Sequence, residues 1–269
     1  MKWVGRIIMI LYGLLVAAPL YFVIVSSFKT SQGFYANPLG WPDPWSFQNF
    51  INIFEAQPML QYFWNSARVT LFTVILVLFL GSLISYGIVR LGGRLGKFAF
   101  AYFVAGLIIP SQVIMLPLYS LVRKLDWSDS LTALIFVTAA GLLPLTVFTL
   151  TGFMEMLSKE MMEAGSMDGA GEWKIYWRLV LPLSGPSLSA TAAFLFVMVW
   201  NDLLIPLLLL NSTDKLTLPL ALMQFRGEYV TDYTMLLTGV IITALPMVIL
   251  FMFLQRFFVT GLTAGSVKG

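Results

Sequence analysis

The sequence predicts an all-α integral membrane protein with six transmembrane helices. Of its 269 residues, 59% are hydrophobic and only 11% are charged, and the mean hydropathy is +0.86. A soluble domain carries about 25% charged residues, so the apolar surplus of this chain must face lipid. Six apolar runs reach the ~20 residues that a spanning helix needs. These observations exclude a soluble enzyme, a nucleic-acid-binding protein and a disordered chain.

The six runs are too long and too uniformly apolar for the alternating strands of a membrane barrel, so we expect helices. The expected spans are about 7–25, 66–89, 98–118, 131–153, 183–210 and 233–258. The first run begins like a secretory signal peptide, but it continues past Pro19 and five more spans follow, which favours a retained helix. The sequence contains no repeat, so we expect residues 1–269 to form a single transmembrane domain.

The distribution of Lys and Arg predicts the orientation of the chain, because cytoplasmic loops carry the excess of these residues. With the N-terminus inside, the inner segments hold Lys2, Arg6, Arg90, Arg94, Lys97, Lys159, Lys174, Arg178, Arg256 and Lys268. The outer segments hold Lys29, Arg68, Arg123, Lys124, Lys215 and Arg226. Both termini are therefore expected in the cytoplasm. We expect the outer segment 28–62, rich in Pro and Trp, to form exposed turns.

The chain offers little chemistry of its own. It has no Cys and no His, so it lacks the usual thiol nucleophile, general base and zinc ligands. The nearest match to a phosphate-binding loop, Gly92–Lys97, has Leu91 where that motif needs its first Gly and Phe98 where it needs Ser or Thr. We expect no catalytic residue, no metal site and no nucleotide site, so any energy source must be another polypeptide.

One inner loop, residues 154–182, is much longer than a connector between neighbouring spans requires. Glycines surround Asp168 and predict a break between two short helices. We expect Ser158 to cap the first helix and Asp168 the second. The expected inward-facing carboxylates all lie in this loop: Glu155, Glu160, Glu163, Asp168 and Glu172.

The second helix of the loop carries Trp173, Tyr176, Trp177 and Val180 at helical spacing, which predicts one aromatic face. Two interpretations of that face stay open on composition alone. The helix lies on the inner lipid surface, or it docks into a groove on a cytoplasmic partner.

The loop also carries a motif. Glu163-Ala164-Gly165, Asp168-Gly169-Ala170 and Leu181-Pro182 resemble the E-A-A-x-x-D-G-A … L-P loop of permease subunits of binding-protein-dependent ABC importers, with Gly165 in place of the second Ala. Further segments resemble the second, six-span permease of the maltose and oligosaccharide class: Asn65-Ser66, Tyr86 with Arg90, Pro110, Leu118-Tyr119, Trp200-Asn201-Asp202, Leu216-Thr217-Leu218, Gln255-Arg256-Phe257 and the tail Gly261–Gly269. The likeness covers essentially the whole chain.

This resemblance implies a type I ABC importer permease in the cell membrane of a prokaryote. It implies as partners a second homologous permease, two copies of a cytoplasmic ATPase that bind ATP-Mg, and an extracytoplasmic solute-binding protein. The chain itself would need no cofactor. The implied substrate is a carbohydrate, with a di- or oligosaccharide favoured and a polyol or glycerol phosphate left open.

The resemblance also implies that the long loop couples ATP hydrolysis to gating. Glu163 and Asp168 are the candidates for contact with a basic group on the ATPase, although capping alone would also explain Asp168. Gly169 would let the turn approach the partner surface.

Polar residues in the spans are candidates for the translocation pathway: Ser111, Gln112, Trp200, Asn201 and Asp202. An ionisable group at membrane depth, such as Asp202, is a functional candidate by default. The alternative is structural, with an interfacial Trp200 and a polar pair bonded to a neighbouring helix.

Two other classes of membrane protein fit less well. An ion-coupled secondary transporter would show more intramembrane carboxylates or an internal repeat. A membrane phosphotransferase would cluster several carboxylates around metal, whereas Asp168 has no further aspartate nearby.

Overall fold

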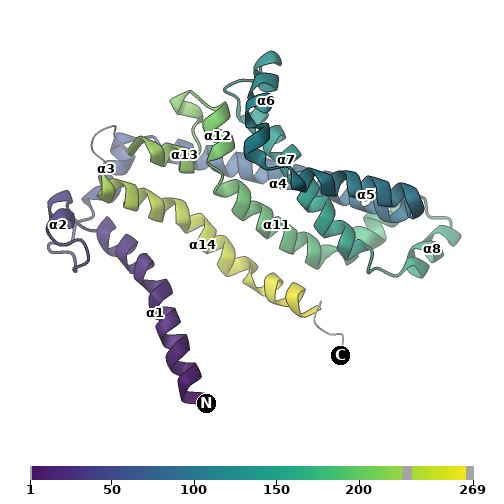
Figure 1. The fold of residues 1–269 in the computed structure, drawn as a ribbon, viewed down its shortest axis with the longest axis horizontal. Helices are drawn as coiled ribbons and strands as arrows, with labels where there is room; N and C mark the ends of the chain where they lie inside the picture. The colour runs from purple at the N-terminus through teal and green to yellow at the C-terminus, as the bar shows by residue number, and fades with distance from the viewer. Residues whose placement is uncertain (1, 226–231, 265–269) are drawn as a thin grey trace. The chain divides into compact units, whose positions relative to one another are not determined.

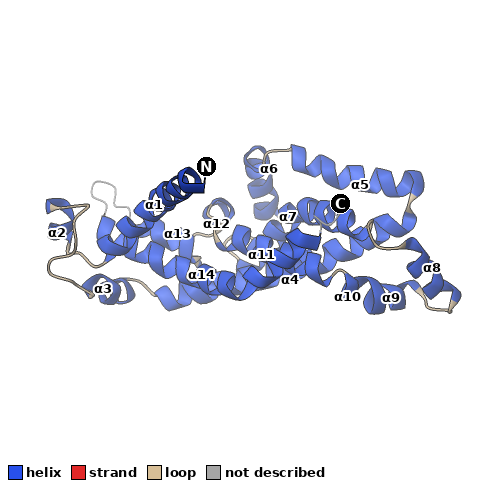
Figure 2. Cartoon of the chain, turned by 90° about the horizontal axis from the view of Figure 1, so that it is seen from below, coloured by secondary structure: helices blue, strands red, loops and turns tan. Residues whose placement is uncertain are grey.

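The computed structural model describes residues 2–225 and 232–264, with side chains for these except Lys2, Lys159 and 253–264. Arg226, Lys268 and the end of the tail motif, residues 265–269, lie outside the described residues, as does the side chain of Arg256. The described residues are helical and contain no strand (Figure 2). The all-helical class is therefore confirmed.

Long and short helices alternate along the chain; Figure 1 labels most of them, and Figure 2 labels α9 and α10. They are α1 (Lys2–Ser27), α2 (Ser31–Ala36), α3 (Gln48–Ala56), α4 (Met59–Leu91), α5 (Gly93–Ile108), α6 (Ser111–Lys124), α7 (Leu131–Met154), α8 (Lys159–Met167), α9 (Glu172–Ile175), α10 (Leu181–Leu183), α11 (Gly185–Trp200), α12 (Leu204–Leu209), α13 (Leu218–Leu222) and α14 (Tyr233–Ala264). A π-helical turn, Tyr176–Val180, joins α9 to α10.

Among the described residues, four helices are long and apolar enough to span a membrane: Trp3–Ser27, Met59–Leu91, Leu131–Met154 and Tyr233–Met252. Two bent pairs also qualify if each pair counts as one span. These pairs are α5 with α6, bent by 97°, and Glu172–Leu183 with α11, bent by 73°. The chain is thus an all-helical membrane protein with four to six candidate spans.

The helix expected over 98–118 does not run straight through that range. Ile109 leaves the helical region, with φ −81° and ψ 116°, and Pro110 opens α6. Proline has no N–H to continue the ladder and disfavours helical geometry in the residue before it, which explains the bend. The range 183–210 is likewise interrupted, between α11 and α12 at residues 201–203.

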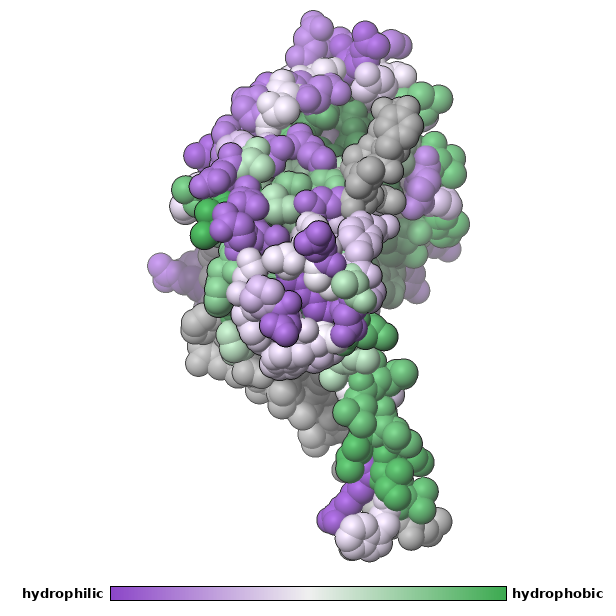
Figure 3. Space-filling view, turned by 90° about the vertical axis from the view of Figure 1, so that its left-hand side faces the viewer, coloured by the Kyte–Doolittle hydropathy of each residue, from purple (hydrophilic) through white to green (hydrophobic). Residues whose placement is uncertain are grey.

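The chain divides into two compact units, one of Met1–Trp64 with Leu216–Ile249 and the other of Asn65–Lys215 with Leu250–Gly269. In the first unit, the hydrophobic window of α1 has no buried residue. Its apolar side chains cover the helix surface in Figure 3. Such a surface is typical of a helix that lies in lipid.

The outer segment in the first unit has exposed turns and bends at residues 38–44, as expected, but also the two helices α2 and α3, which were not. The ring centroid of Phe28 lies 5.2 Å from the ring centroids of Trp45, Phe47 and Phe50. Lys29 is 2% exposed, and its Nζ donates to the carbonyl oxygens of residues 37 and 38 at 2.8 and 2.9 Å. Burial lowers the pKa of Lys29. The aromatic contacts lie beside two short helices, α2 and α3, that the sequence did not predict, although Trp45 and Phe47 remain 48% and 65% exposed.

In the second unit, α4, α7 and α11 share a small core of Val77, Ala139 and Leu195. Close approach depends on Gly81, where an added Cβ would lie 2.5 Å from Cγ2 of Thr146. Small residues at such crossings let membrane helices pack by direct backbone approach.

Asp129, in the loop before α7, ties that loop to the segment after α12. Its carboxylate accepts hydrogen bonds from the Ser212 hydroxyl, the N–H groups of Asn211 and Ser212 (2.9 and 3.0 Å) and Nζ of Lys215 (2.9 Å). The bonds from Ser212, Asn211 and Lys215 hold the pKa of Asp129 well below its usual value. We call this group the Asp129 clasp.

Candidate functional site: the loop at residues 154–182

The long loop folds into two short helices with a break between them, as predicted. The first, α8, begins after Ser158, whose Oγ accepts the N–H of Met161 at 3.3 Å. The second, α9, continues through the π-helical turn into α10. The N-cap predicted at Ser158 is confirmed. Figure 2 shows α8 beside α9.

The break is a helix C-terminus built on Gly169. This residue has φ +75°, and the N–H groups of Gly169 and Ala170 reach back to the carbonyls of Ser166 and Gly165 at 3.1 and 3.0 Å. These bonds are those of a Schellman motif, which requires a left-handed residue and therefore favours glycine. An added Cβ at Gly169 would meet no atom within 4 Å, so within this chain the need for glycine is conformational.

The prediction that Asp168 caps the second helix is wrong. Asp168 is the C-terminal cap of α8, with φ −75° and ψ 8°, and the N-terminal cap of α9 is Gly171 without a side-chain bond. Residues 168–170 form the Schellman turn that ends α8. The N-cap of α9 therefore lies three residues after Asp168, at Gly171. The carboxylate of Asp168 is left exposed, without a hydrogen-bond partner among the described residues.

A small core holds the two helices against the end of α4. Its buried members are Tyr86, Met154, Met162, Ile175, Tyr176 and Val180. Ala170 and Leu181, both predicted site residues, pack against this core. Gly165 faces Ile175, whose Cγ1 would lie 3.5 Å from an added Cβ. These three motif residues therefore shape the loop from within.

The predicted aromatic face is only partly correct. Tyr176 and Val180 are 1% exposed, but Trp173 and Trp177 are 64% and 48% exposed. The π-helical turn adds residues per turn from Tyr176 onward, so the 3.6-residue spacing assumed from the sequence does not hold for Trp177 and Val180. Ile175, not the tryptophans, completes the buried face.

Sequence reasoning missed the ion pair that anchors α9. Arg90, in the last turn of α4, donates Nε to Oε2 of Glu172 at 2.9 Å and Nη2 to Oε1 of the same carboxylate. The hydroxyl of Tyr86 also donates to Oε2, and Arg90 Nη2 reaches Oγ of Ser166 on α8 at 3.2 Å. We call this group, Tyr86, Arg90, Ser166 and Glu172, the α4–loop joint. Tyr86 and Arg90 at i and i+4 were a visible signal, because that spacing places both on one helix face.

The outward edge of the loop carries the remaining motif residues. Glu163, Ala164, Asp168 and Gly169 are exposed, and Met167 between them is 83% exposed. The carboxylate of Glu163, like that of Asp168, bonds to no described residue. Pro182 is also exposed, beyond the π-helical turn. The loop thus has a packed inner side and an outer edge whose carboxylates at 163 and 168 bond to no described residue.

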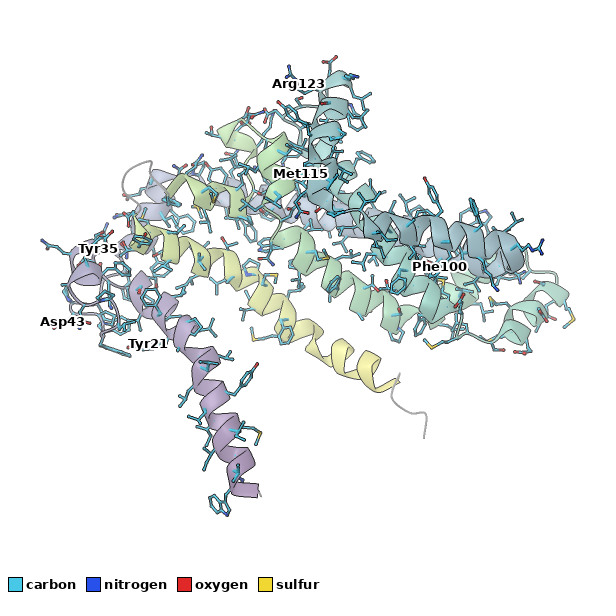
Figure 4. All side chains as sticks on the ribbon, viewed as in Figure 1. Tyr21, Tyr35, Asp43, Phe100, Met115 and Arg123 are labelled. Atoms are coloured by element: carbon cyan, nitrogen blue, oxygen red, sulfur yellow. The ribbon has the colours of Figure 1, made fainter. Side chains whose placement is uncertain are left out.

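The predicted pathway residues fall into two sets. Ser111 and Gln112 lie in the first turn of α6, directly after the bend, and both are exposed without a hydrogen bond to any described residue. Farther along α6, Met115 and Arg123 are labelled in Figure 4, as is Phe100 on α5. At the bend, the first turn of α6 therefore carries two polar side chains that have no hydrogen-bond partner among the described residues.

The second set lies at the end of α11. Trp200 is 2% exposed and stacks on Phe196 with ring centroids 5.5 Å apart. Asp202 accepts the N–H groups of Leu204 and Ile205 at 3.1 and 3.4 Å, which caps the start of α12. Asn201 donates to the carbonyl of Val197 at 2.8 Å. Asp202 thus bonds to the next helix, as the structural alternative expects, whereas Trp200 is buried and Asn201 bonds within its own helix, which that alternative did not expect.

Comparison with known proteins identifies the class. Residues 77–263 match the family described as binding-protein-dependent transport system inner membrane component. The chain is therefore a permease, the multi-pass membrane component of a binding-protein-dependent ABC importer of the bacterial inner membrane, and it belongs to that family. The family implies an ATPase and a binding protein as partners.

Individual relatives extend along nearly the whole chain. The arabinooligosaccharides transport system permease protein AraQ of Halalkalibacterium halodurans is 36% identical over 93% of this chain and 91% of its own. The melibiose/raffinose/stachyose import permease protein MelC of Bacillus subtilis is 33% identical over 98% and 97%. The fold resembles a crystal structure of a bacterial ABC transporter for import of alginate, with a TM-score of 0.82 over 96% of both chains at 18% identity.

Proposed function

We propose that this chain is the second, six-span permease of a carbohydrate importer, and that loop 154–182 is its contact with the ATPase. In this proposal the chain pairs with a homologous permease, and the pair binds two copies of the ATPase in the cytoplasm. An extracytoplasmic binding protein delivers a di- or oligosaccharide. The substrate class rests on the names of the relatives, which concern arabinooligosaccharides and melibiose, raffinose and stachyose.

The observation that carries the proposal is the exposed acidic edge of the loop. Glu163 and Asp168 are exposed and bond to no described residue, although both sit on a packed scaffold. An unpaired carboxylate on a rigid element is ready for a charge-assisted bond to a basic group on another protein. Hydrolysis by the ATPase would then move the loop as a stiff lever.

The two ends of α4 support the proposed orientation, with both termini and the loop in the cytoplasm. Arg90 bonds to the loop at one end, while Asn65 donates to the carbonyl of Asp214 at 2.9 Å at the other. These residues are separated by about 40 Å of helix at 1.5 Å per residue, more than the ~30 Å thickness of the hydrocarbon core. The positive cluster Arg90–Lys97 favours the cytoplasm for the loop end.

For the pathway, we propose that Ser111 and Gln112 face the substrate at the bend between α5 and α6. Their free hydroxyl and amide groups suit a sugar, whose hydroxyl groups both donate and accept hydrogen bonds. The bend supports this, because non-helical backbone at membrane depth is tolerated where it lines a water-filled cavity. Trp200, Asn201 and Asp202 would support the outer end of α11 and α12, with Asp202 as a cap.

The direct test is charge reversal on the edge of the loop. Glu163→Arg is expected to abolish uptake and co-purification of the ATPase while the permease still inserts. Glu55→Arg is the matched control, since Glu55 is an exposed carboxylate on α3 that bonds to no described residue, and the ATPase should co-purify with it as with the wild type. Unchanged ATPase binding by Glu163→Arg would refute the proposal.

A further inference from the structure

We propose that the α4–loop joint transmits the movement of loop 154–182 to helix α4, and that Arg90 and Glu172 are positioning residues for gating. The inference rests on the proposed function of the loop, because it assumes that the ATPase moves it. It adds the path by which that movement enters the membrane.

In the α4–loop joint, the side chain of Arg90 bonds to both helices of the loop. Arg90 holds the carboxylate of Glu172, at the start of α9, with two nitrogen atoms, and its Nη2 also donates to Ser166 on α8 at 3.2 Å. Ser166 in turn donates to the carbonyl of Met162 at 3.1 Å. Two parallel bonds between a guanidinium and a carboxylate fix orientation as well as distance, so α8 and α9 are held in a set direction relative to α4.

Contacts deeper in the second unit extend the joint along α4. The hydroxyl groups of Ser82 and Tyr176 are hydrogen-bonded at 2.7 Å in a buried position. The rings of Tyr86 and Tyr176 lie 5.5 Å apart. Ser82, Tyr86 and Arg90 follow one another at i, i+4 and i+8, so these three contacts lie on a single face of α4. A displacement of α9 would therefore act on two turns of the helix at once.

The exposure of the ion pair argues that its role is orientation more than stability. The side chains of Arg90 and Glu172 are 27% and 57% exposed, and ion pairs at such positions contribute little to folding free energy. The buried core of the loop, which includes Met162 and Ile175, does not depend on them. A permease without the ion pair should fold and bind the ATPase, with the loop still packed on Tyr86 of α4 but no longer held in a fixed direction relative to that helix.

The test uses charge reversal in the assembled transporter, reconstituted in lipid vesicles with its ATPase, partner permease and binding protein. Arg90→Glu and Glu172→Arg should each keep ATPase co-purification, because Glu163 and Asp168 are untouched. Uptake per ATP hydrolysed should fall by about tenfold or more. The double variant should restore most of that ratio. Arg94→Glu, which makes the same charge change at an exposed neighbour that bonds to no described residue, should leave the ratio unchanged.

Normal uptake per ATP in either single variant, or no recovery in the double variant, would overturn the role of the joint and leave the proposed function intact. Failure of the wild-type chain to bind the ATPase would instead refute the proposed function.

A second measurement leaves the ion pair unchanged and follows the distance between the loop and α4. The chain has no Cys, so Met167→Cys and Leu91→Cys, both at exposed positions, can carry one spin label each. Their distance should stay constant with and without ATP, and a change would contradict the proposal.

Discussion

At the scale of single residues, the glycine at position 169 has two explanations: the backbone conformation requires it, or the close approach of the partner surface does. Its φ of +75° closes α8, and a β-branched residue there would cost roughly 1–2 kcal/mol, whereas Asn tolerates this region better. We expect Gly169→Val to weaken ATPase co-purification strongly and Gly169→Asn to retain most of it. Equal loss in both variants would show that the partner surface, and not the backbone, demands glycine.

Gly165 is the position where the chain departs from the motif that it resembles. An Ala Cβ would make an ordinary contact with Ile175 at 3.5 Å, and Ala is favoured over Gly inside a helix by about 1 kcal/mol. We expect Gly165→Ala to raise the midpoint of thermal unfolding by about 2–4 °C.

Gly81→Ala provides the contrast, because its Cβ would lie 2.5 Å from Thr146 Cγ2. That variant should lower the midpoint in the same detergent. A lower midpoint for Gly165→Ala would mean that α8 and α9 pack more tightly than the structure indicates.

At the scale of elements, the Asp129 clasp predicts a pH dependence. Hydrogen bonds from Ser212, Asn211 and Lys215 lower the folded-state pKa of Asp129. The carboxylate therefore stabilises the fold above the unfolded pKa of about 4, and this contribution is lost as the pH falls below it. We expect Asp129→Asn to cost about 1–2 kcal/mol near pH 7.

The difference between the wild type and Asp129→Asn should shrink as the pH is lowered below about 4, measured by thermal unfolding at each pH. Asp126→Asn is the control, because Asp126 also has a positive φ, of 54°, but is exposed and has no side-chain partner among the residues described. A pH-independent difference for Asp129→Asn would contradict the clasp.

The sequence predicted long elements better than their interruptions. Apolar length alone predicts α4 and α7 to within a few residues at most ends. The sequence could not single out Pro110 as the site of a bend, because proline also occurs inside continuous helices such as α7. The π-helical turn from Tyr176 to Val180 depends on packing against α4 and leaves no periodic signal.

The same distinction holds for the candidate site. The motif identified the loop, and the Ser158 cap was visible as a residue type before a helix-forming run. Asp168 was assigned to the start of the second helix because Asp is a common N-cap residue, but it ends the first helix through its backbone, and its carboxylate caps neither. The partner of Glu172 lies 82 residues away, and a single sequence carries no pairing signal at that distance.

At the scale of the whole molecule, the chain is one component of an importer whose energy source is another protein. The family match and the relatives establish that class, and the acidic edge of the loop is the proposed point of contact. The scaffold behind this edge is apolar and the edge itself is charged. The interface is therefore expected to weaken as salt is raised, while the permease itself stays folded.

The most direct measurement is site-specific crosslinking in the assembled transporter, which the absence of Cys makes straightforward. Met167→Cys, 83% exposed on the loop edge, should form an adduct with the ATPase through a short bifunctional reagent. Leu125→Cys, 54% exposed beside the Asp129 clasp, should form none. If Met167→Cys gives no ATPase adduct in an actively transporting complex, the loop is not the point of contact.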